Sequence, residues 1–229
     1  MFKLITSWDD GDVLDLKLAK LLAQYGFKGT FYLTRDYKGN RLTDKEIRSL
    51  AEQHEVGAHT LTHRDLRPLS LVEKKQEILG SKEWLEGIVG KTISTFCYPY
   101  GFYDEETVRV VRESGFSQAR TTSVGKGGDV LEMAVSLQVY PFPFRKKDAK
   151  TYNWQDIFKP FLERAHDLHR LGVPYSAMTS WGKMARAGLI SAMKEDREFH
   201  LWGHSWEIER YGMWGELEDF LKYASTIKR

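Results

Sequence analysis

The chain has 229 residues, with 34 Lys and Arg against 32 Asp and Glu, so its formal net charge is only +2. This balance, without a block of like charges, argues against a nucleic acid or an anionic membrane as partner. The single cysteine, Cys97, excludes an internal disulfide. The length suits one large α/β domain, and we expect residues 1–229 to form a single domain.

The first residues, MFKLITSWDD, run straight into charge and lack the apolar stretch and cleavage site of a signal peptide. No run approaches the roughly 18 apolar residues of a membrane span. From these two features we expect a soluble, cytoplasmic protein. The sequence carries no sign of an oligomeric state.

In chain order, strand-like and helical runs alternate through the first half of the chain. The strand-like runs lie at residues 2–8, 29–34, 54–59, 93–99 and 116–122. The helical runs lie at residues 13–25, from 43 to about 53, from 70 onward and at 105–115. Alternation of this kind implies a parallel sheet, and the length favours a closed or distorted barrel over an open sheet.

Two of the expected helices open with a capping box, in which a Ser or Thr side chain and a Glu three residues later cap each other's backbone. Thr43 and Glu46 form the first box, and Ser70 and Glu73 form the second. Residues 125–129 form a glycine-rich loop that lacks the Lys and Ser/Thr of a phosphate-binding loop.

The second half of the chain has a weaker pattern. Residues 139–144 are aromatic and interrupted by proline, and residues 154–171 read as a helix with Pro160 near its start. Residues 198–206 read as a late strand, and residues 213–226 as an amphipathic helix.

Two adjacent carboxylates, Asp9 and Asp10, end the first expected strand in the sequence TSWDDG. Like charges this close raise each other's cost of ionisation, so a buried pair needs a metal, a cation or a shared proton. A plain Asp-Gly turn is the alternative interpretation.

Two histidine pairs have a spacing of four residues: His59 with His63 in HTLTH, and His200 with His204 in HLWGH. This spacing puts both rings on one side of a helix or on one face of a strand, so periodicity leaves both open. Two histidines and a carboxylate with one open position are a common ligand set of hydrolytic zinc sites. TSWDDG and HTLTH supply that set from two successive strand ends, although an accidental HxxxH pattern remains the alternative.

Four segments taken together resemble the polysaccharide deacetylases, the NodB-homology or carbohydrate esterase family 4 group. They are TSWDDG, HTLTH, YPYG at 98–101 and LWGH at 201–204, and they match in order and rough spacing over nearly the whole chain. The resemblance implies an α/β fold of the distorted (β/α)7-8 barrel type, similar to a TIM barrel. It also implies removal of N-acetyl or related acyl groups with a divalent metal, Zn²⁺ first and Co²⁺, Mn²⁺ or Ni²⁺ as alternatives.

By position, the resemblance implies that Asp9 is the general base and that His204 is the general acid. It implies that Asp10, His59 and His63 are the metal ligands.

The resemblance also implies substrate contacts. Tyr100 falls where a backbone N–H helps to hold the oxyanion, and Leu201 falls where a leucine lines the acyl pocket. Trp154 and Trp206 are candidates for a sugar-binding groove, with aromatic core as the alternative for Trp206.

The chain departs from the family pattern at the third motif. Where the family has an arginine that pairs with the base aspartate, this chain has Cys97. We interpret Cys97 as a small buried residue and Arg120 as a surface arginine, with Arg120 as substitute partner of Asp9 the alternative.

The fourth motif also differs, because the family's Asp-Trp pair is replaced by residues 153–154, Asn-Trp. Glu207 or Asp156 is therefore expected to orient His204. His54 and His200 are interpreted as structural residues.

Three functions follow from these observations. The first is a metal-dependent deacetylase of an N-acetylated sugar or glycan. The second keeps the site but acts on a small amide, such as a cyclic ureide or a formylated amino sugar. The third is a carbohydrate-binding barrel without turnover.

Overall fold

The computed structural model describes residues 3–125, 128–144 and 154–227, in the last range without the side chains of 154–157. The described chain divides into two compact units, which we treat separately. One is Thr6–Val135, and the other combines Met1–Ile5 with Ser136–Arg229.

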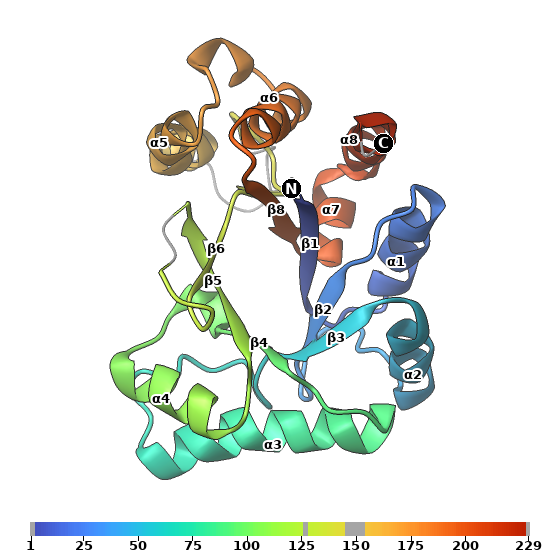
Figure 1. Cartoon of the computed structure of the whole chain (residues 1–229), viewed down its shortest axis with the longest axis vertical. Helices are drawn as coiled ribbons and strands as arrows, with labels where there is room; N and C mark the ends of the chain where they lie inside the picture. Colours follow the sequence, from blue (N-terminus) through green and yellow to red (C-terminus); the bar gives the residue numbers. More distant parts are fainter. Residues whose placement is uncertain (1–2, 126–127, 145–153, 228–229) are drawn as a thin grey trace. The chain divides into compact units, whose positions relative to one another are not determined.

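The unit of residues 6–135 is built on parallel strands with helices between them. Each strand pairs in parallel with the next along the chain, in the order β1 (Lys3–Asp10), β2 (Thr30–Leu33), β3 (Glu55–Ala58), β4 (Thr95–Cys97), β5 (Gln118–Val124) and β6 (Met133–Val135). The helices are α1 (Asp15–Gln24), α2 (Asp44–Gln53), α3 (Leu71–Val89) and α4 (Glu105–Glu113), and a short 3₁₀ turn, η1, covers Pro99–Gly101. Figure 1 shows these four helices along the outer side of β1 to β5. The predicted alternation and parallel pairing are confirmed.

Both predicted capping boxes are present. The Thr43 hydroxyl accepts from the Glu46 N–H at 3.3 Å, and the Glu46 carboxylate accepts from the Thr43 N–H at 2.8 Å. The same reciprocal pair joins Ser70 and Glu73. These bonds fix where α2 and α3 begin, and with them the loops that precede these helices.

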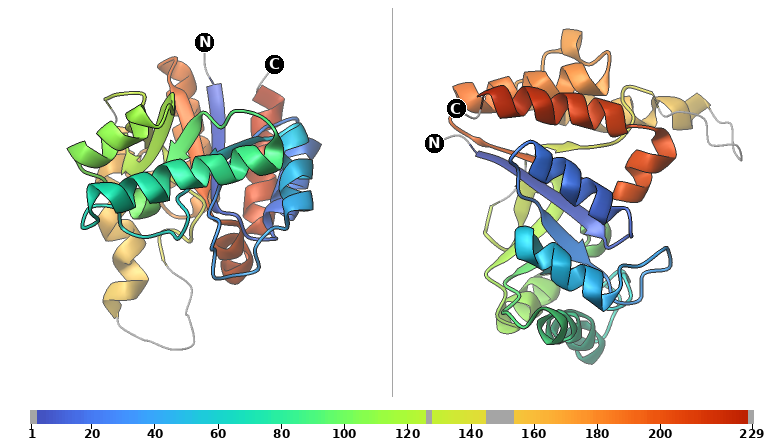
Figure 2. Two further views of the ribbon diagram at one scale, coloured as in Figure 1. Left: turned by 90° about the horizontal axis from the view of Figure 1, so that it is seen from below. Right: turned by 90° about the vertical axis from the view of Figure 1, so that its right-hand side faces the viewer.

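Besides the first residues of β1, the described part of the unit that contains residues 136–229 has two strands. β7 (Leu137–Gln138) runs parallel to β8 (Glu198–Gly203). The helices are α5 (Trp154–Arg170), α6 (Trp181–Lys194), α7 (Ser205–Tyr211) and α8 (Trp214–Ile227), with a 3₁₀ turn, η2, at Tyr175–Ala177. Figure 2 shows α6 beside α8, where the ring of Trp181 meets that of Phe220 edge to face at 5.7 Å.

The predicted strand at 198–206 is shorter in the structure, because β8 ends at Gly203 and α7 begins at Ser205. His204 is therefore the N-cap residue of a helix, with an extended backbone. No helix among the described residues is long and apolar enough to cross a lipid bilayer.

The Ser70 cap gives a stability prediction. Replacing Ser70 with Ala removes the hydroxyl that accepts from the Glu73 N–H, so the free energy of unfolding should fall by about 1 kcal/mol. Urea unfolding of the variant measures this loss. Ser49→Ala, at an exposed position inside α2, is the matched control and should cost nothing, since Ala favours a helix interior. Equal stability of Ser70→Ala and the wild type would contradict the prediction.

Candidate metal and catalytic site

The two adjacent carboxylates at the end of β1 are buried. Asp9 is 3% exposed and Asp10 is 7% exposed. The chain also turns here, because Asp10 and Gly11 both have a φ of 83°. Asp tolerates this left-handed conformation better than most side chains, and a Cβ on Gly11 would come within 3.1 Å of Leu33. The turn and the charged site therefore coexist, and the turn sends the two carboxylates to different partners.

Asp10 lies with two imidazoles. Its Oδ1 is 3.8 Å from Nε2 of His59 and 3.4 Å from Nε2 of His63. The three potential ligand atoms all lie within 4.8 Å of one another. The predicted HTLTH pair is thus brought together with Asp10, on a loop after β3 rather than on a helix or a strand.

The HTLTH loop is held by α3. Thr60 and His63 have φ values of 66° and 56°, and the Thr60 hydroxyl accepts from the His63 N–H at 3.0 Å. The buried carboxylate of Glu77 accepts from the N–H groups of Leu61 and Thr62, each at 2.9 Å, and from the Thr62 hydroxyl. Sequence reasoning missed Glu77, which fixes the loop that carries both histidines.

The protonation state of His59 suits metal binding. Its Nδ1 lies 2.7 Å from the carbonyl oxygen of Cys97, which can only accept, so Nδ1 carries the proton and the lone pair is on Nε2. Burial lowers the pKa of His59 to about 4, and the nearby His63 also lowers it. The ring is therefore neutral at pH 7, with its free nitrogen toward Asp10 and His63.

This donor set fits a divalent metal ion. Two imidazole nitrogens and one carboxylate oxygen converge, which is a three-ligand set that hydrolytic zinc sites combine with an open position. Ligand atoms about 2.1 Å from a tetrahedral metal lie about 3.4 Å apart. The separations of 3.4 and 3.8 Å from Asp10 to the two histidines are close to this value.

Asp9 pairs with an arginine. Arg120 is fully buried, and its Nη2 donates to the Asp9 carboxylate. Its guanidinium carbon lies 5.3 Å from the centre of the Tyr32 ring. Burial by itself lowers the pKa of Arg120, but the adjacent Asp9 raises it, and the net result is a raised pKa and a permanent positive charge. The prediction of a surface arginine is wrong.

The reason lies in strand register. Arg120 in β5 is the direct neighbour of Cys97 in β4. Cys97 is the position at which the resemblance places the family's arginine. The guanidinium therefore reaches Asp9 from the next strand, and Cys97 leaves space for it because its side chain is small.

Cys97 is buried, as predicted, and is not activated. Burial raises the pKa of its thiol well above the usual range, the positive charge of Arg120 lowers it in part, and Asp9 adds to the rise. A thiol in this state is a poor nucleophile.

Tyr100 lies in η1, directly after β4, with a φ of 58°. Its side chain is 56% exposed, and its ring meets that of His63 edge to face at 4.6 Å. The structure thus places the residue expected to hold the oxyanion next to a candidate metal ligand.

The remaining predicted residues belong to the other unit. Leu201 is buried in β8, and His204 follows the strand. His204 Nδ1 lies 2.6 Å from Glu207 Oε2, which also accepts from Gln138 Nε2 at 3.0 Å. Glu207 therefore orients His204, as one of the two sequence alternatives predicts. The half-buried Trp206 contacts the His204 ring at 5.4 Å.

Other predictions concern residues outside this set. The side chains of Trp154 and Asp156 lie outside the described residues. His200 is buried in β8, where its backbone N–H donates to the Ser136 hydroxyl. His54 is buried, and its Nδ1 accepts from the Gly29 N–H at 3.2 Å, so both fit the structural interpretation.

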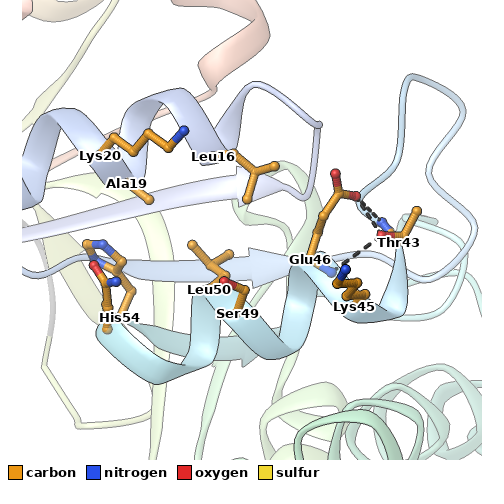
Figure 3. A pocket seen from close by; sticks show the side chains of 10 residues that line it. Leu16, Ala19, Lys20, Thr43, Lys45, Glu46, Ser49, Leu50 and His54 are labelled. Atoms are coloured by element: carbon orange, nitrogen blue, oxygen red, sulfur yellow. Dashed lines mark hydrogen bonds between the residues drawn. The ribbon is translucent and has the colours of Figure 1, made fainter.

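A pocket of about 450 Å³ lies between α1 and α2 (Figure 3), where Leu16, Ala19 and Leu50 provide apolar surface and His54 lies at one end. Its lining contains none of the predicted site residues. We assign it no part in the chemistry.

Comparison with known proteins identifies the family of the chain. Residues 3–119 match the family model described as polysaccharide deacetylase. The chain belongs to the polysaccharide deacetylase family. The matched range contains the Asp10, His59 and His63 cluster, and it ends one residue before Arg120.

Two members of the polysaccharide deacetylase family match this chain over about half of its length. "Putative polysaccharide deacetylase YxkH" of Bacillus subtilis is 27% identical over 126 residues, which are 53% of this chain and 45% of that protein. The crystal structure of BC0361, a polysaccharide deacetylase from Bacillus cereus, has 26% identity and a TM-score of 0.52, over 58% of this chain and 46% of the other. The chain spans about half the length of the curated relatives that it matches.

A third likeness covers nearly the whole chain. The "putative polysaccharide deacetylase from Mycobacterium smegmatis" has a TM-score of 0.69 over 98% of this chain and 84% of the other, at 16% identity. At that identity the likeness shows the fold alone. The predicted α/β fold, the distorted (β/α) barrel of this family, is confirmed.

The buried Cys97 gives a prediction for thiol chemistry. Because burial raises the pKa of this thiol, little thiolate forms at pH 8, and the folded protein should react with an aromatic disulfide reagent at least about tenfold more slowly than the unfolded chain. Absorbance of the released thiolate, with and without denaturant, measures both rates. Equal rates would show that Cys97 is accessible and ionised.

Proposed function

We propose that this chain is a metal-dependent hydrolase that removes an N-acetyl or related N-acyl group from an amino sugar or glycan. The convergence of Asp10, His59 and His63 beside the Asp9–Arg120 pair supports this proposal most strongly. We also propose Zn²⁺ as the metal, and residues 1–229 as one catalytic domain.

Hydrolysis of an amide requires three kinds of catalytic assistance, because an amide is a poor electrophile and an amine is a poor leaving group. Water must be activated, the developing oxyanion must be stabilised, and the nitrogen must receive a proton. Asp10, His59 and His63 would hold the metal, which when bound lowers the pKa of water toward about 7 and polarises the carbonyl.

Asp9 is the proposed base for the attacking water. A base must stay ionised until it accepts the proton, and a buried carboxylate tends to protonate instead. The buried guanidinium of Arg120 opposes this tendency and restrains the carboxylate through its hydrogen bond. Arg120 is thus the proposed positioning residue for Asp9.

The backbone N–H of Tyr100 is the proposed donor to the oxyanion. A donor of this kind is worth about 3 kcal/mol in the transition state. Leu201 is the proposed wall of the acyl pocket, and Trp154 and Trp206 are proposed to contact the sugar.

His204 is the proposed acid for the departing nitrogen. The hydrogen bond from Nδ1 to Glu207 leaves Nε2 as the atom that would donate the proton. Glu207 thereby replaces the Asp of the family's Asp-Trp pair, which this chain lacks.

A small, non-polymeric amide is the second candidate substrate. The departures at Cys97 and at residues 153–154 favour it, since the residues that differ lie in motifs of the family's base and acid.

Replacement of the proposed base tests the mechanism. Asp9→Asn should retain the metal, because Asp10 and the histidines remain, and should lower kcat for acetate release by about 10² or more. Metal analysis and an acetate assay with N-acetylglucosamine oligomers and small amides measure both. Release that persists at the wild-type rate with metal bound would refute the role of Asp9. Absence of release by the wild type from every glycan and amide, with metal bound, would favour a binding protein.

Arg120 can be tested by its effect on pH dependence. Arg120→Lys keeps a buried charge but loses the planar fork that donates to the Asp9 carboxylate, so the ionised base is less well stabilised and the acidic limb of kcat/KM should move to higher pH. Arg120→Met leaves Asp9 buried without its cation and should lower stability by about 3 kcal/mol or more. An unchanged acidic limb in Arg120→Lys would show that Arg120 does not act on the base.

A further inference from the structure

A second pocket lies wholly within the unit that contains His204. Its volume is about 210 Å³, and it is lined by residues around β7, α5 and α7: Gln138, Tyr140, Lys159, Pro160, Glu163, Arg164 and Glu207. Glu207 is also the hydrogen-bond partner of His204. The pocket is therefore separated from the proposed acid by a single side chain.

The charged side chains of this pocket differ in whether they have a hydrogen-bond or salt-bridge partner. Glu163 pairs with Lys159 at 3.6 Å on the same helix. Glu207 accepts from His204 and from Gln138, which is itself buried. Within the described part of the chain, the guanidinium of Arg164 makes no hydrogen bond or salt bridge, although both carboxylates act on its charge from a distance.

Arg164 is also partly desolvated. Its side chain is half-buried, and burial lowers its pKa, which the charges of Glu163 and Glu207 offset only in part. Water satisfies the donors of a partly desolvated arginine only in part, so a ligand that accepts hydrogen bonds from them gains free energy there. The planar fork of an arginine matches two oxygens of one oxyanion.

The volume of the pocket and the charges that line it limit the class of ligand. Pockets for whole small molecules usually measure about 300 Å³ or more, so this one suits a substituent of a larger molecule. The two lining carboxylates disfavour a doubly charged group such as phosphate and tolerate a single negative charge better. A carboxylate meets both conditions.

We propose that the Arg164 pocket binds the carboxylate of an acidic sugar. This inference rests on the proposed function in that the acidic sugar would be part of the N-acyl substrate, with its carboxylate anchored one side chain from His204. The pocket then selects acidic over neutral sugars, while the chemistry stays with the residues described above.

Binding tests the pocket without any need for turnover. Titration calorimetry of the full chain with D-glucuronate, against D-glucose as its neutral counterpart, should show saturable binding of glucuronate alone. Arg164→Gln should weaken that binding by about tenfold or more, as expected for loss of a charge-assisted hydrogen bond. Arg164→Lys should be intermediate, because it keeps the charge but loses the fork.

Arg170→Gln is the matched control, since it removes the same charge from an exposed position on the same helix and should bind as the wild type does. Circular dichroism confirms that each variant folds. Equal binding of glucuronate and glucose, or wild-type affinity in Arg164→Gln, would overturn the proposal. Binding of inorganic phosphate in preference to glucuronate would overturn the assignment to a carboxylate.

The two proposals fail in different ways. If glucuronate binding depends on Arg164 but no N-acyl sugar releases acid, the pocket stands and the proposed function falls. If acetate is released from neutral and acidic N-acetyl sugars with the same kcat/KM in wild type and Arg164→Gln, the function stands and the pocket is refuted as a determinant of the substrate.

Discussion

The burial of two adjacent carboxylates at the end of β1 is the constraint on which the rest of the site depends. Each ionised group costs several kcal/mol to bury unless another charge or a set of hydrogen bonds compensates it. The left-handed backbone at Asp10 sends the two side chains to different partners. Asp9 meets Arg120, and Asp10 meets two imidazoles that are suited to share a cation with it.

The separate partners of Asp9 and Asp10 are positioned by elements other than β1. Two residues of the HTLTH loop, Thr60 and His63, have a positive φ, which costs free energy in residues other than glycine. Glu77 of α3 accepts hydrogen bonds from two backbone N–H groups of this loop. The carbonyl of Cys97 in β4 sets the tautomer of His59. The side chains that hold the site are therefore placed by an outer helix and a neighbouring strand as much as by the motifs themselves.

Local patterns made α1 to α4 and β1 to β5 predictable, including both capping boxes, because each depends on residues two to four apart. In the second half of the chain the pattern is weaker, and α6, α7, β6 and β7 were not predicted. The roles of the motif residues followed instead from the resemblance of four segments to the polysaccharide deacetylases. The place of Arg120 was not predictable, since its burial follows from its alignment with Cys97 across β4 and β5, and a sequence does not state register. Glu77 carries no local signal either, because a glutamate in mid-helix is usually a solvated residue.

The contacts that hold the acid and the base of the proposed reaction in place differ in sequence separation. Glu207 lies three residues after His204, in the first turn of α7, so one short segment sets the geometry of that pair. Arg120 and Asp9 are 111 residues apart and meet only when β1, β4 and β5 are in place. The His204–Glu207 pair can therefore tolerate changes elsewhere in the chain that would separate Arg120 from Asp9. Since Glu207 also borders the Arg164 pocket, a charge held in that pocket would act directly on the hydrogen-bond partner of the proposed acid.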